Sequence, residues 1–250
     1  MKLSDLFKSA LSSLWSRRVR SFLTSLGVII GVFAVAALLS VAEASVNSLN
    51  DSLSILNSEA IELWVNNPDI DFDYTDVEAM EEIDSIEVVS PYANMDAEVI
   101  NGYISLQSRV VMTVESYKVA KNIEVHTGRF LLDIDQQEKT KSVVLGINVA
   151  INLFGGMDII GEVIDINGDE FTVVGVLKDT PSSLFGNTND YVFIPKSTGE
   201  GIFGFEGISQ MSIKGVSDDS EISMKDIEEF LMIKYGDEDS YNIFSNDQAQ

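Results

Sequence analysis

The sequence predicts an α+β protein in which one N-terminal transmembrane helix carries a two-part extracytoplasmic domain. Three observations predict this class: an uncharged apolar run near the N-terminus, strand–helix–strand patterns near both ends of the remaining chain, and a β-rich segment between them. With 45% hydrophobic and 22% charged residues among 250, the composition is that of a folded protein with a sizeable core.

The apolar run begins at Ser21 and ends at Ala42, and no charged residue lies between Arg20 and Glu43. A helix of this length reaches about 33 Å at about 1.5 Å per residue, which is enough to cross a hydrocarbon core of about 30 Å. We therefore expect a transmembrane helix over residues 19–43. The alternatives are a cleavable signal peptide, which has a shorter apolar run, and a buried soluble helix.

The charged residues are distributed unevenly along the chain. The net charge is −24, from 40 acidic and 16 basic residues, yet residues 1–20 alone carry +4. By the positive-inside rule, the N-terminus is expected in the cytoplasm and the chain from about residue 45 onward outside the cell membrane. Arg17, Arg18 and Arg20 are expected to fix this topology and to bind anionic lipid headgroups. The acidic excess opposes binding along a nucleic-acid backbone, so no nucleic-acid partner is expected.

Helical patterns flank the predicted span on both sides. Apolar residues recur at three- and four-residue steps through residues 1–18, which predicts an amphipathic helix that lies in the membrane interface or packs on a partner subunit. A similar pattern over residues 44–60 predicts a stalk helix. Within the span, Gly27 and Gly31 form a G-x-x-x-G pair, which is typical of close contacts between membrane helices.

The outer domain is expected over residues 61–250. Residues 61–66 alternate apolar and polar side chains, as a half-buried strand does. A capping box at Thr75–Glu78 predicts a short helix, and a strand over 86–90 that Pro91 stops completes a strand–helix–strand unit. The same succession is predicted again near the C-terminus.

The elements expected between and within these units are hairpins at Asn101-Gly102 and Asn167-Gly168, strands over 142–146, 191–195, 208–214 and 241–244, and helices over 147–154 and 223–235. The order of these elements predicts one subdomain built from both ends of the domain, residues 61–115 and 206–250. Residues 116–205 are expected to form a second, β-rich subdomain inserted in the first.

Residue types that carry catalysis or bind metals are scarce. There is no Cys, and His126 is the only His, which excludes thiol chemistry and His-based metal sites. Acidic residues recur at Asp69, Asp71, Asp73 and Asp76, as at the start of a calcium loop. Gly is absent from the sixth position and Glu from the twelfth, which favours a solvated loop. A hydrolase that uses two of the carboxylates is the remaining enzymatic alternative, but no pair is marked by spacing.

No phosphate-binding P-loop sequence occurs, so any ATP must be bound by a partner subunit. We therefore expect no catalytic residue, no bound cofactor and no metal in this chain, and we do not expect an enzyme.

The segment Arg18–Val32, RVRSFLTSLGVIIGV, resembles the N-terminal signature of MacB/FtsX-type ABC-transporter permeases, in which R-S-x-L-T-x-L-G-I-x-I-G-V opens the first membrane helix. Six further motifs occur in the order of that family's periplasmic core, at Thr127–Phe130, Ser142–Gly146, Leu153–Gly155, Gly161–Glu162, Phe171–Val176 and Asp190–Pro195. The resemblance covers essentially the whole chain.

The resemblance implies the permease portion of an ABC transporter, in which a partner ATPase drives movement of the outer domain to export or extract a peptide, lipoprotein or antibiotic. It also implies a porter-like fold for the subdomain formed by both chain ends. The partners it implies are an ABC ATPase, a second permease copy, the lipid bilayer and a periplasmic adaptor. Because the family has three further membrane helices after the core, we expect this chain to be a fragment of a four-helix permease. The alternative from another class is a single-pass sensor or ligand-binding ectodomain.

Overall fold

The computed structural model describes residues 22–23, 25–41, 60–67, 72–180, 187–204, 207–217, 220–236 and 240–245. The chain divides into two compact units, residues 1–51 and residues 52–250. The predicted amphipathic helix over residues 1–18 lies outside the described residues. So does the predicted stalk over 44–60, apart from Ala60, with which the first strand begins.

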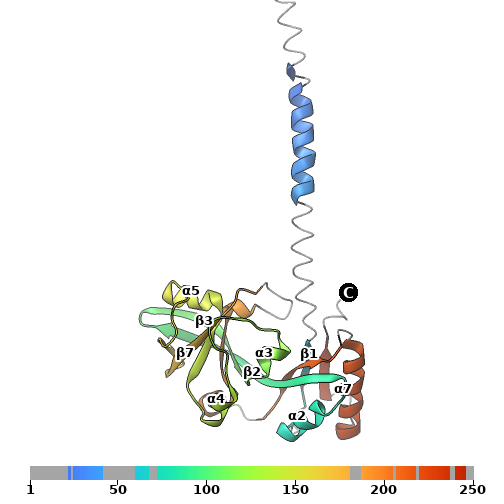
Figure 1. Ribbon diagram of the computed structural model, residues 1–250, viewed down its shortest axis with the longest axis vertical. Helices are drawn as coiled ribbons and strands as arrows, with labels where there is room; N and C mark the ends of the chain where they lie inside the picture. The colour runs from blue at the N-terminus through green and yellow to red at the C-terminus, as the bar shows by residue number, and fades with distance from the viewer. Residues whose placement is uncertain are drawn as a thin grey trace, which may run out of the picture. The chain divides into compact units, whose positions relative to one another are not determined.

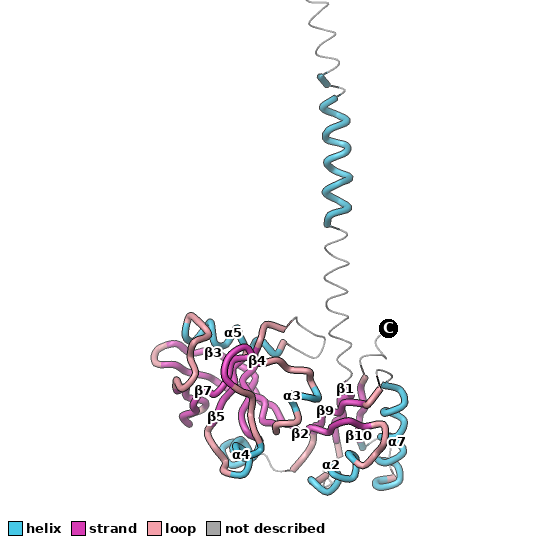
Figure 2. The backbone as a smooth tube through the Cα atoms, viewed as in Figure 1, coloured by secondary structure: helices cyan, strands magenta, loops and turns pink. Residues whose placement is uncertain are grey.

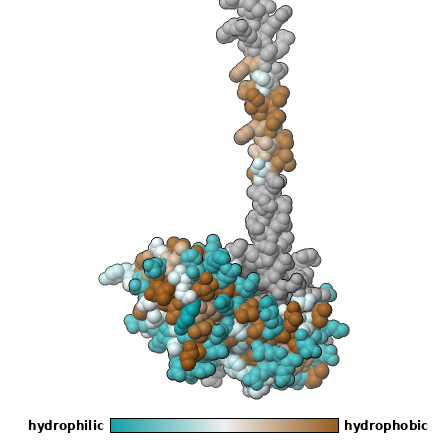
Figure 3. Space-filling view, viewed as in Figure 1, coloured by the Kyte–Doolittle hydropathy of each residue, from teal (hydrophilic) through white to brown (hydrophobic). Residues whose placement is uncertain are grey.

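In the first unit, residues 22–23 and 25–41 are helical, and their side chains are exposed. Figure 3 shows apolar side chains along this helix on the visible face. Across the residues that the structure describes, no helix has both the length and the hydropathy needed to cross a membrane. Positions 19–21, 24 and 42–43 of the predicted span fall outside the described residues, so the span stays a prediction.

The second unit is built on a sheet of ten strands. They are β1 (Ala60–Val65), β2 (Ile86–Asn101), β3 (Ile104–Thr113), β4 (Val125–Gly128), β5 (Ser142–Leu145), β6 (Val163–Ile166), β7 (Asp169–Leu177), β8 (Tyr191–Pro195), β9 (Gln210–Gly215) and β10 (Tyr241–Phe244). Their order is β10-β1-β9-β2-β3-β8-β5-β7-β4, and β6 pairs with both β2 and β7. The sheet therefore holds strands from both ends of the domain next to one another.

One part of this unit, here called the sheet lobe, consists of β10, β1, β9 and the first half of β2, all antiparallel. Two helices, α2 (Tyr74–Glu81) and α7 (Ser220–Tyr235), lie beside these strands (Figure 1). Ile61, Leu63 and Ile213 from the strands pack with Met80 of α2 and Ile227 of α7, and all five are fully buried. This packing buries one face of the sheet under the two helices.

The other part, here called the barrel lobe, arises because the strand pairing closes on itself. The second half of β2 pairs with β3, β3 with β8, β8 with β5, β5 with β7, β7 with β6, and β6 again with β2. The pairs β3–β8 and β5–β7 are parallel and the others antiparallel. Val99, Val110, Leu145, Phe171 and Val192 fill the interior and are fully buried. Figure 2 shows these strands gathered around a common centre.

Short helices complete the barrel lobe: α3 (Tyr117–Ala120), α4 (Asp133–Gln137), α5 (Ile147–Phe154), the 3-10 turn η1 (Thr188–Asp190) and α6 (Lys196–Phe203). Helix α5 packs Val149, Ala150 and Leu153 into the barrel core. It ends at Gly155, whose φ of 74° provides a left-handed cap.

Strand β2 is longer than the sequence predicts and belongs to both lobes. A stop at Pro91 was expected, but β2 continues through it to Asn101. Pairing with β3 begins only at Tyr92, opposite Thr113, and the Pro91 carbonyl accepts a hydrogen bond from the Thr113 hydroxyl. The nitrogen of Pro91 faces the same side of β2 as its carbonyl, at a position beyond the end of β3. No strand there needs an N–H donor, so the proline removes no hydrogen bond between strands. Residues 97–112, expected in the first subdomain, consequently contribute to the barrel core.

Two further expectations differ by one or two positions. Helix α2 is capped by Asp73 rather than by Thr75, because the Asp73 carboxylate accepts from the backbone N–H of Thr75 and Asp76 while the Asp76 carboxylate accepts from the Asp73 N–H. The β2–β3 hairpin exists, but its two loop residues are Gly102, with φ of 60°, and Tyr103. The Asn167-Gly168 hairpin forms as predicted, with positive φ at both residues.

Candidate functional site

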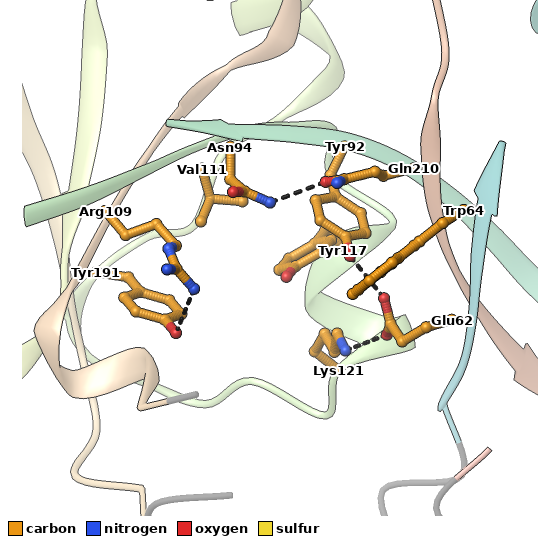
Figure 4. A pocket seen from close by; sticks show the side chains of 10 residues that line it. All are labelled: Glu62, Trp64, Tyr92, Asn94, Arg109, Val111, Tyr117, Lys121, Tyr191 and Gln210. Carbon is orange, nitrogen blue, oxygen red and sulfur yellow. Dashed lines mark hydrogen bonds and ion pairs between the residues drawn. The ribbon is translucent and has the colours of Figure 1, made fainter. Parts of the chain in front are cut away.

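A cavity of about 440 Å³ lies on the face of the sheet that points away from α2 and α7, where the sheet lobe passes into the barrel lobe. Its side chains come from β1, β9, β2, β3, β8 and the segment around α3. They are Glu62, Trp64, Tyr92, Asn94, Arg109, Val111, Tyr117, Lys121, Tyr191 and Gln210. Figure 4 shows these side chains pointing into a common space. The volume is typical of a small-molecule site.

The strand register explains why these residues meet. Trp64 of β1 pairs with Gln210 of β9, and Gln210 pairs on its other side with Tyr92 of β2. Directly paired residues project from the same face of a sheet, so the three side chains form one row. The neighbouring residues Ile61 and Leu63 point to the other face, into the core under α7.

A buried carboxylate lies at the side of the cavity formed by β1. Glu62 is only 2% exposed, although the alternating pattern of the strand suggested a solvent-facing position. One carboxylate oxygen accepts a hydrogen bond of 2.7 Å from the Tyr92 hydroxyl, and the other pairs with the Lys121 ammonium at the end of α3. Because a buried charge is costly unless it is paired and hydrogen-bonded, this cluster explains how β1 tolerates an acid here.

Two tyrosines of the cavity stay in their neutral form. Burial raises the pKa of Tyr92 far above its usual range, and the negative charge of Glu62 raises it further. Burial, and then the same carboxylate, also raises the pKa of Tyr117. Both phenols are therefore hydrogen-bond donors at physiological pH rather than nucleophiles or bases.

Arg109 lies at the opposite side of the cavity. Its Nη1 donates to the Tyr191 hydroxyl at 3.3 Å, and its guanidinium carbon lies 5.4 Å from the centre of the Tyr191 ring. Its Nε lies 3.6 Å from the carboxylate of Asp96, which is 73% exposed. Between Arg109 and Tyr92, the Asn94 amide donates to the Gln210 side-chain carbonyl at 2.8 Å. Figure 4 shows both pairs facing the cavity.

These groups can bind and orient a ligand by hydrogen bonds, ring contacts and one guanidinium charge. The site holds no nucleophile with an adjacent base. Among the residues that the structure describes, no group of three or more His, Asp or Glu could hold a metal ion.

The residues that the sequence singled out do not lie in this cavity. Arg17, Arg18 and Arg20 lie outside the described residues. Gly27 and Gly31 lie in the helix over 25–41, and a Cβ added at either would meet nothing within 4 Å.

The remaining candidates from the sequence take structural positions or lie outside the description. His126 is exposed on β4. Asp73 and Asp76 cap α2, which accounts for half of the calcium-like acidic pattern, while Asp69 and Asp71 lie outside the described residues.

Sequence reasoning missed the cavity because its residues are distant in the chain and match no motif. One signal was available in composition. Residues 21–250 contain only 11 basic residues against 39 acidic ones, and two of those basic residues, Arg109 and Lys121, face each other across this space. Two of the few basic residues of an acidic domain thus line the same cavity.

The fold and its cavity can be compared with known proteins. Residues 21–242 match the family described as the MacB-like periplasmic core domain. The chain belongs to this family. The match begins inside the predicted membrane span and ends within β10, so it takes in both lobes.

MacB-like relatives align along nearly the entire chain. The macrolide export ATP-binding/permease protein MacB of Campylobacter jejuni is 27% identical over 97% of this chain and 40% of its own length. The uncharacterized ABC transporter permease YknZ of Bacillus subtilis is 24% identical over 99% of this chain and 65% of its own length. This chain thus spans about 40% of the length of the MacB relatives that it matches. The relatives are permease components of ABC transporters.

Two solved structures share the MacB-like fold. The periplasmic region of MacB from Actinobacillus actinomycetemcomitans superposes with a TM-score of 0.65 at 20% identity, over 79% of this chain and 93% of the other. The extracellular domain of YknZ from Gram-positive bacteria gives 0.61 at 21% identity, over 74% of this chain and 99% of the other. At this identity, the likeness establishes the two-lobed mixed α/β fold.

Proposed function

We propose that this chain forms the first membrane helix and the extracytoplasmic domain of a MacB/FtsX-type ABC-transporter permease, which a partner ATPase moves as it binds and hydrolyses ATP. The exported or extracted substrate would be of the kind that MacB-like permeases handle, such as a peptide, a lipoprotein or an antibiotic. A membrane of the cell is the expected location, with the N-terminus in the cytoplasm.

One structural observation carries this proposal. The first strand of the domain, β1, pairs antiparallel with its last strand, β10, and Glu62 near the start of β1 lies opposite Phe244 at the end of β10. The chain therefore enters and leaves the domain at neighbouring points. This arrangement suits a domain inserted between membrane helices, because both connections must return to the same bilayer surface.

The sheet supports a mechanical role. β1, the strand that follows the predicted span and stalk, pairs on both sides, with β10 and with β9. A displacement applied at its start would be shared by the sheet lobe, and the 16-residue β2 would carry it into the barrel lobe. Gly27 and Gly31 would form a contact with a second permease copy, so Gly27→Leu should lower the dimeric fraction in lipid.

The experiment that tests the proposal is co-purification from native membranes. The full-length permease, tagged and extracted with lipid, should retain an ATPase subunit with a P-loop, and the pair in nanodiscs should hydrolyse ATP. A matched preparation in which the ATPase P-loop Lys is replaced should keep the complex and lose hydrolysis. Recovery of the permease without any ATPase under these conditions would favour a single-pass sensor or binding ectodomain instead.

A further inference from the structure

The cavity between the two lobes has a charge opposite to that of the domain around it. Its lining holds Arg109 and Lys121 against the single carboxylate of Glu62, whereas residues 21–250 hold 39 acidic and 11 basic residues. Lys121 is engaged by Glu62. The charge that remains for a ligand is that of Arg109, whose ion pair with Asp96 at 3.6 Å involves a carboxylate that is largely in solvent.

A second observation concerns the hydroxyl of Tyr117. Tyr117 is only 6% exposed, and its ring packs on Tyr92 and Phe193 at centroid distances of 5.4 and 6.1 Å. Its hydroxyl has no hydrogen-bond partner among the described residues, and Figure 4 shows it directed into the cavity on the side of Arg109 and Tyr191. The ring is held in the core while the hydroxyl opens onto the cavity, so its O–H is available to an acceptor atom of a ligand there.

Further donors lie beside the Tyr117 hydroxyl. A guanidinium has five N–H donors in a planar fork, and the contacts of Arg109 with Tyr191 and Asp96 leave donors available. The side-chain amide of Gln210 accepts from Asn94 through its oxygen, which leaves its NH2 group for a ligand. Guanidinium, hydroxyl and amide donors around one space fit an acceptor-only group with a single negative charge, as a carboxylate has.

The walls indicate the rest of the ligand. Trp64 is 37% exposed and borders the cavity together with the rings of Tyr92 and Tyr191. Such aromatic faces favour a flat or apolar body. A group with two negative charges is disfavoured, because it would place the second charge near Glu62 with no further cation to offset it.

We propose that this cavity binds a small organic carboxylate, with the carboxylate held by Arg109 and the Tyr117 hydroxyl and a ring or apolar body packed against Trp64 and Tyr191. The proposal does not depend on the transport function, since it rests on the geometry of the outer domain alone.

The test is a fluorescence titration of the full chain in lipid nanodiscs. The chain has two tryptophans, so Trp15→Phe leaves Trp64 as the only indole reporter. The probes are N-acetyl-L-phenylalanine and its amide, N-acetyl-L-phenylalaninamide, which differ in the charge of the group that Arg109 would bind. The acid should give a saturable change in Trp64 emission, and the amide should bind about tenfold more weakly or worse, since a charge-assisted hydrogen bond is lost.

Matched variants separate the site from bulk charge. Arg109→Gln should weaken binding of the acid by about tenfold or more, and Tyr117→Phe by about three- to tenfold, the usual range for one hydrogen bond. Lys141→Gln removes the same charge from a half-exposed surface ion pair with Asp169 and should leave binding unchanged. Without ligand, Tyr117→Phe should unfold at the same denaturant concentration as the parent, because the hydroxyl it removes has no partner to lose.

Three results would overturn the proposal. They are titrations in which the acid and the amide behave alike, an affinity loss in Lys141→Gln equal to that in Arg109→Gln, and the absence of saturable binding of the acid up to millimolar concentration.

Discussion

The hydroxyl of Tyr92 donates a 2.7 Å hydrogen bond to the carboxylate of Glu62, across the intervening strand β9. The same carboxylate pairs with Lys121, so β1, β2 and the end of α3 meet at one buried charge. Sheet lobe and barrel lobe are thus joined by the continuous strand β2 and also by a polar contact beside the cavity.

Replacing Lys121 by Met should lower the free energy of unfolding by about 3 kcal/mol, because it leaves the buried Glu62 carboxylate without its counter-charge. The double variant with Glu62→Gln should lose less than the sum of the two single variants, since the uncompensated charge is then absent. Urea denaturation followed by circular dichroism measures these values.

The control for this pair is Lys178→Met. Lys178 and Glu124 form an ion pair whose side chains are 58% and 66% exposed, so its loss should cost about 1 kcal/mol or less. Equal losses at Lys121 and Lys178, or strictly additive effects in the double variant, would contradict the account of a buried cluster.

Gly175→Ala should destabilise the barrel lobe by about 1–3 kcal/mol through overpacking. A Cβ at Gly175 would lie 2.0 Å from the carbonyl oxygen of Arg129. Gly156→Ala is the matched control, because a Cβ there meets nothing within 4 Å and its φ is not in the left-handed region. The midpoints of thermal unfolding of both variants test this prediction. A Gly175→Ala protein as stable as the parent would contradict it, because the backbone at Arg129 would then have made room for the methyl group at no cost.

The stability of the barrel lobe should fall with acid through Asp135. Burial raises the pKa of this carboxyl, but hydrogen bonds from Arg129, the Leu132 N–H and Thr140 outweigh burial and hold the pKa at about 2. Because the folded pKa lies below the ordinary value of 3.8, the stabilisation is complete above pH 4 and is lost as the pH falls toward 2.

Asp135→Asn should therefore lower the unfolding midpoint at pH 7 and flatten its dependence on pH between about 4 and 2. Unfolding midpoints measured at closely spaced pH values test this expectation. A variant with the same acid-dependent slope as the parent would place the titrating group elsewhere.

The arginines before the predicted span should set the orientation of the chain. The protein has no Cys, and Tyr103 at the tip of the β2–β3 hairpin is fully exposed, so Tyr103→Cys provides a single labelling site. A membrane-impermeant maleimide should label it in intact cells. Changing Arg17, Arg18 and Arg20 together to Glu should reduce this labelling, while the triple Lys variant should not. Equal labelling of the Glu and Lys variants would refute the role of these charges.

Local signals in the sequence predicted much of the fold. The helix over 147–154, the Asn167-Gly168 hairpin and the strand over 241–244 all form where their residues predicted them. Each is determined by residues close together in the chain. Pro91 misled the prediction because a proline interrupts a strand only where the neighbouring strand needs an N–H donor at that position. Strand β3 ends before the position opposite Pro91, so no donor is needed there.

The closed barrel and the cavity could not be predicted from local sequence patterns, because both depend on contacts between residues far apart in the chain. Pairing of β6 with β2 joins residues 165–166 to 99–100, and the Glu62–Lys121 contact spans 59 positions. The alternation of β1 predicted a solvent-facing Glu62 because the pattern contains no information about α3. The order of the predicted elements supplied the expectation of a two-part domain, and the family resemblance agreed with it, but neither singled out Arg109 or Tyr117.

The most direct test of the permease account measures movement of the outer domain. Spin labels on Tyr103→Cys in the full-length permease, paired with its ATPase in nanodiscs, report the distance between the two copies by double electron–electron resonance. The account predicts that this distance distribution shifts when non-hydrolysable ATP analogue replaces ADP, and that the shift is absent with an ATPase lacking its P-loop Lys. An identical distribution in both nucleotides, with the ATPase bound and active, would contradict it.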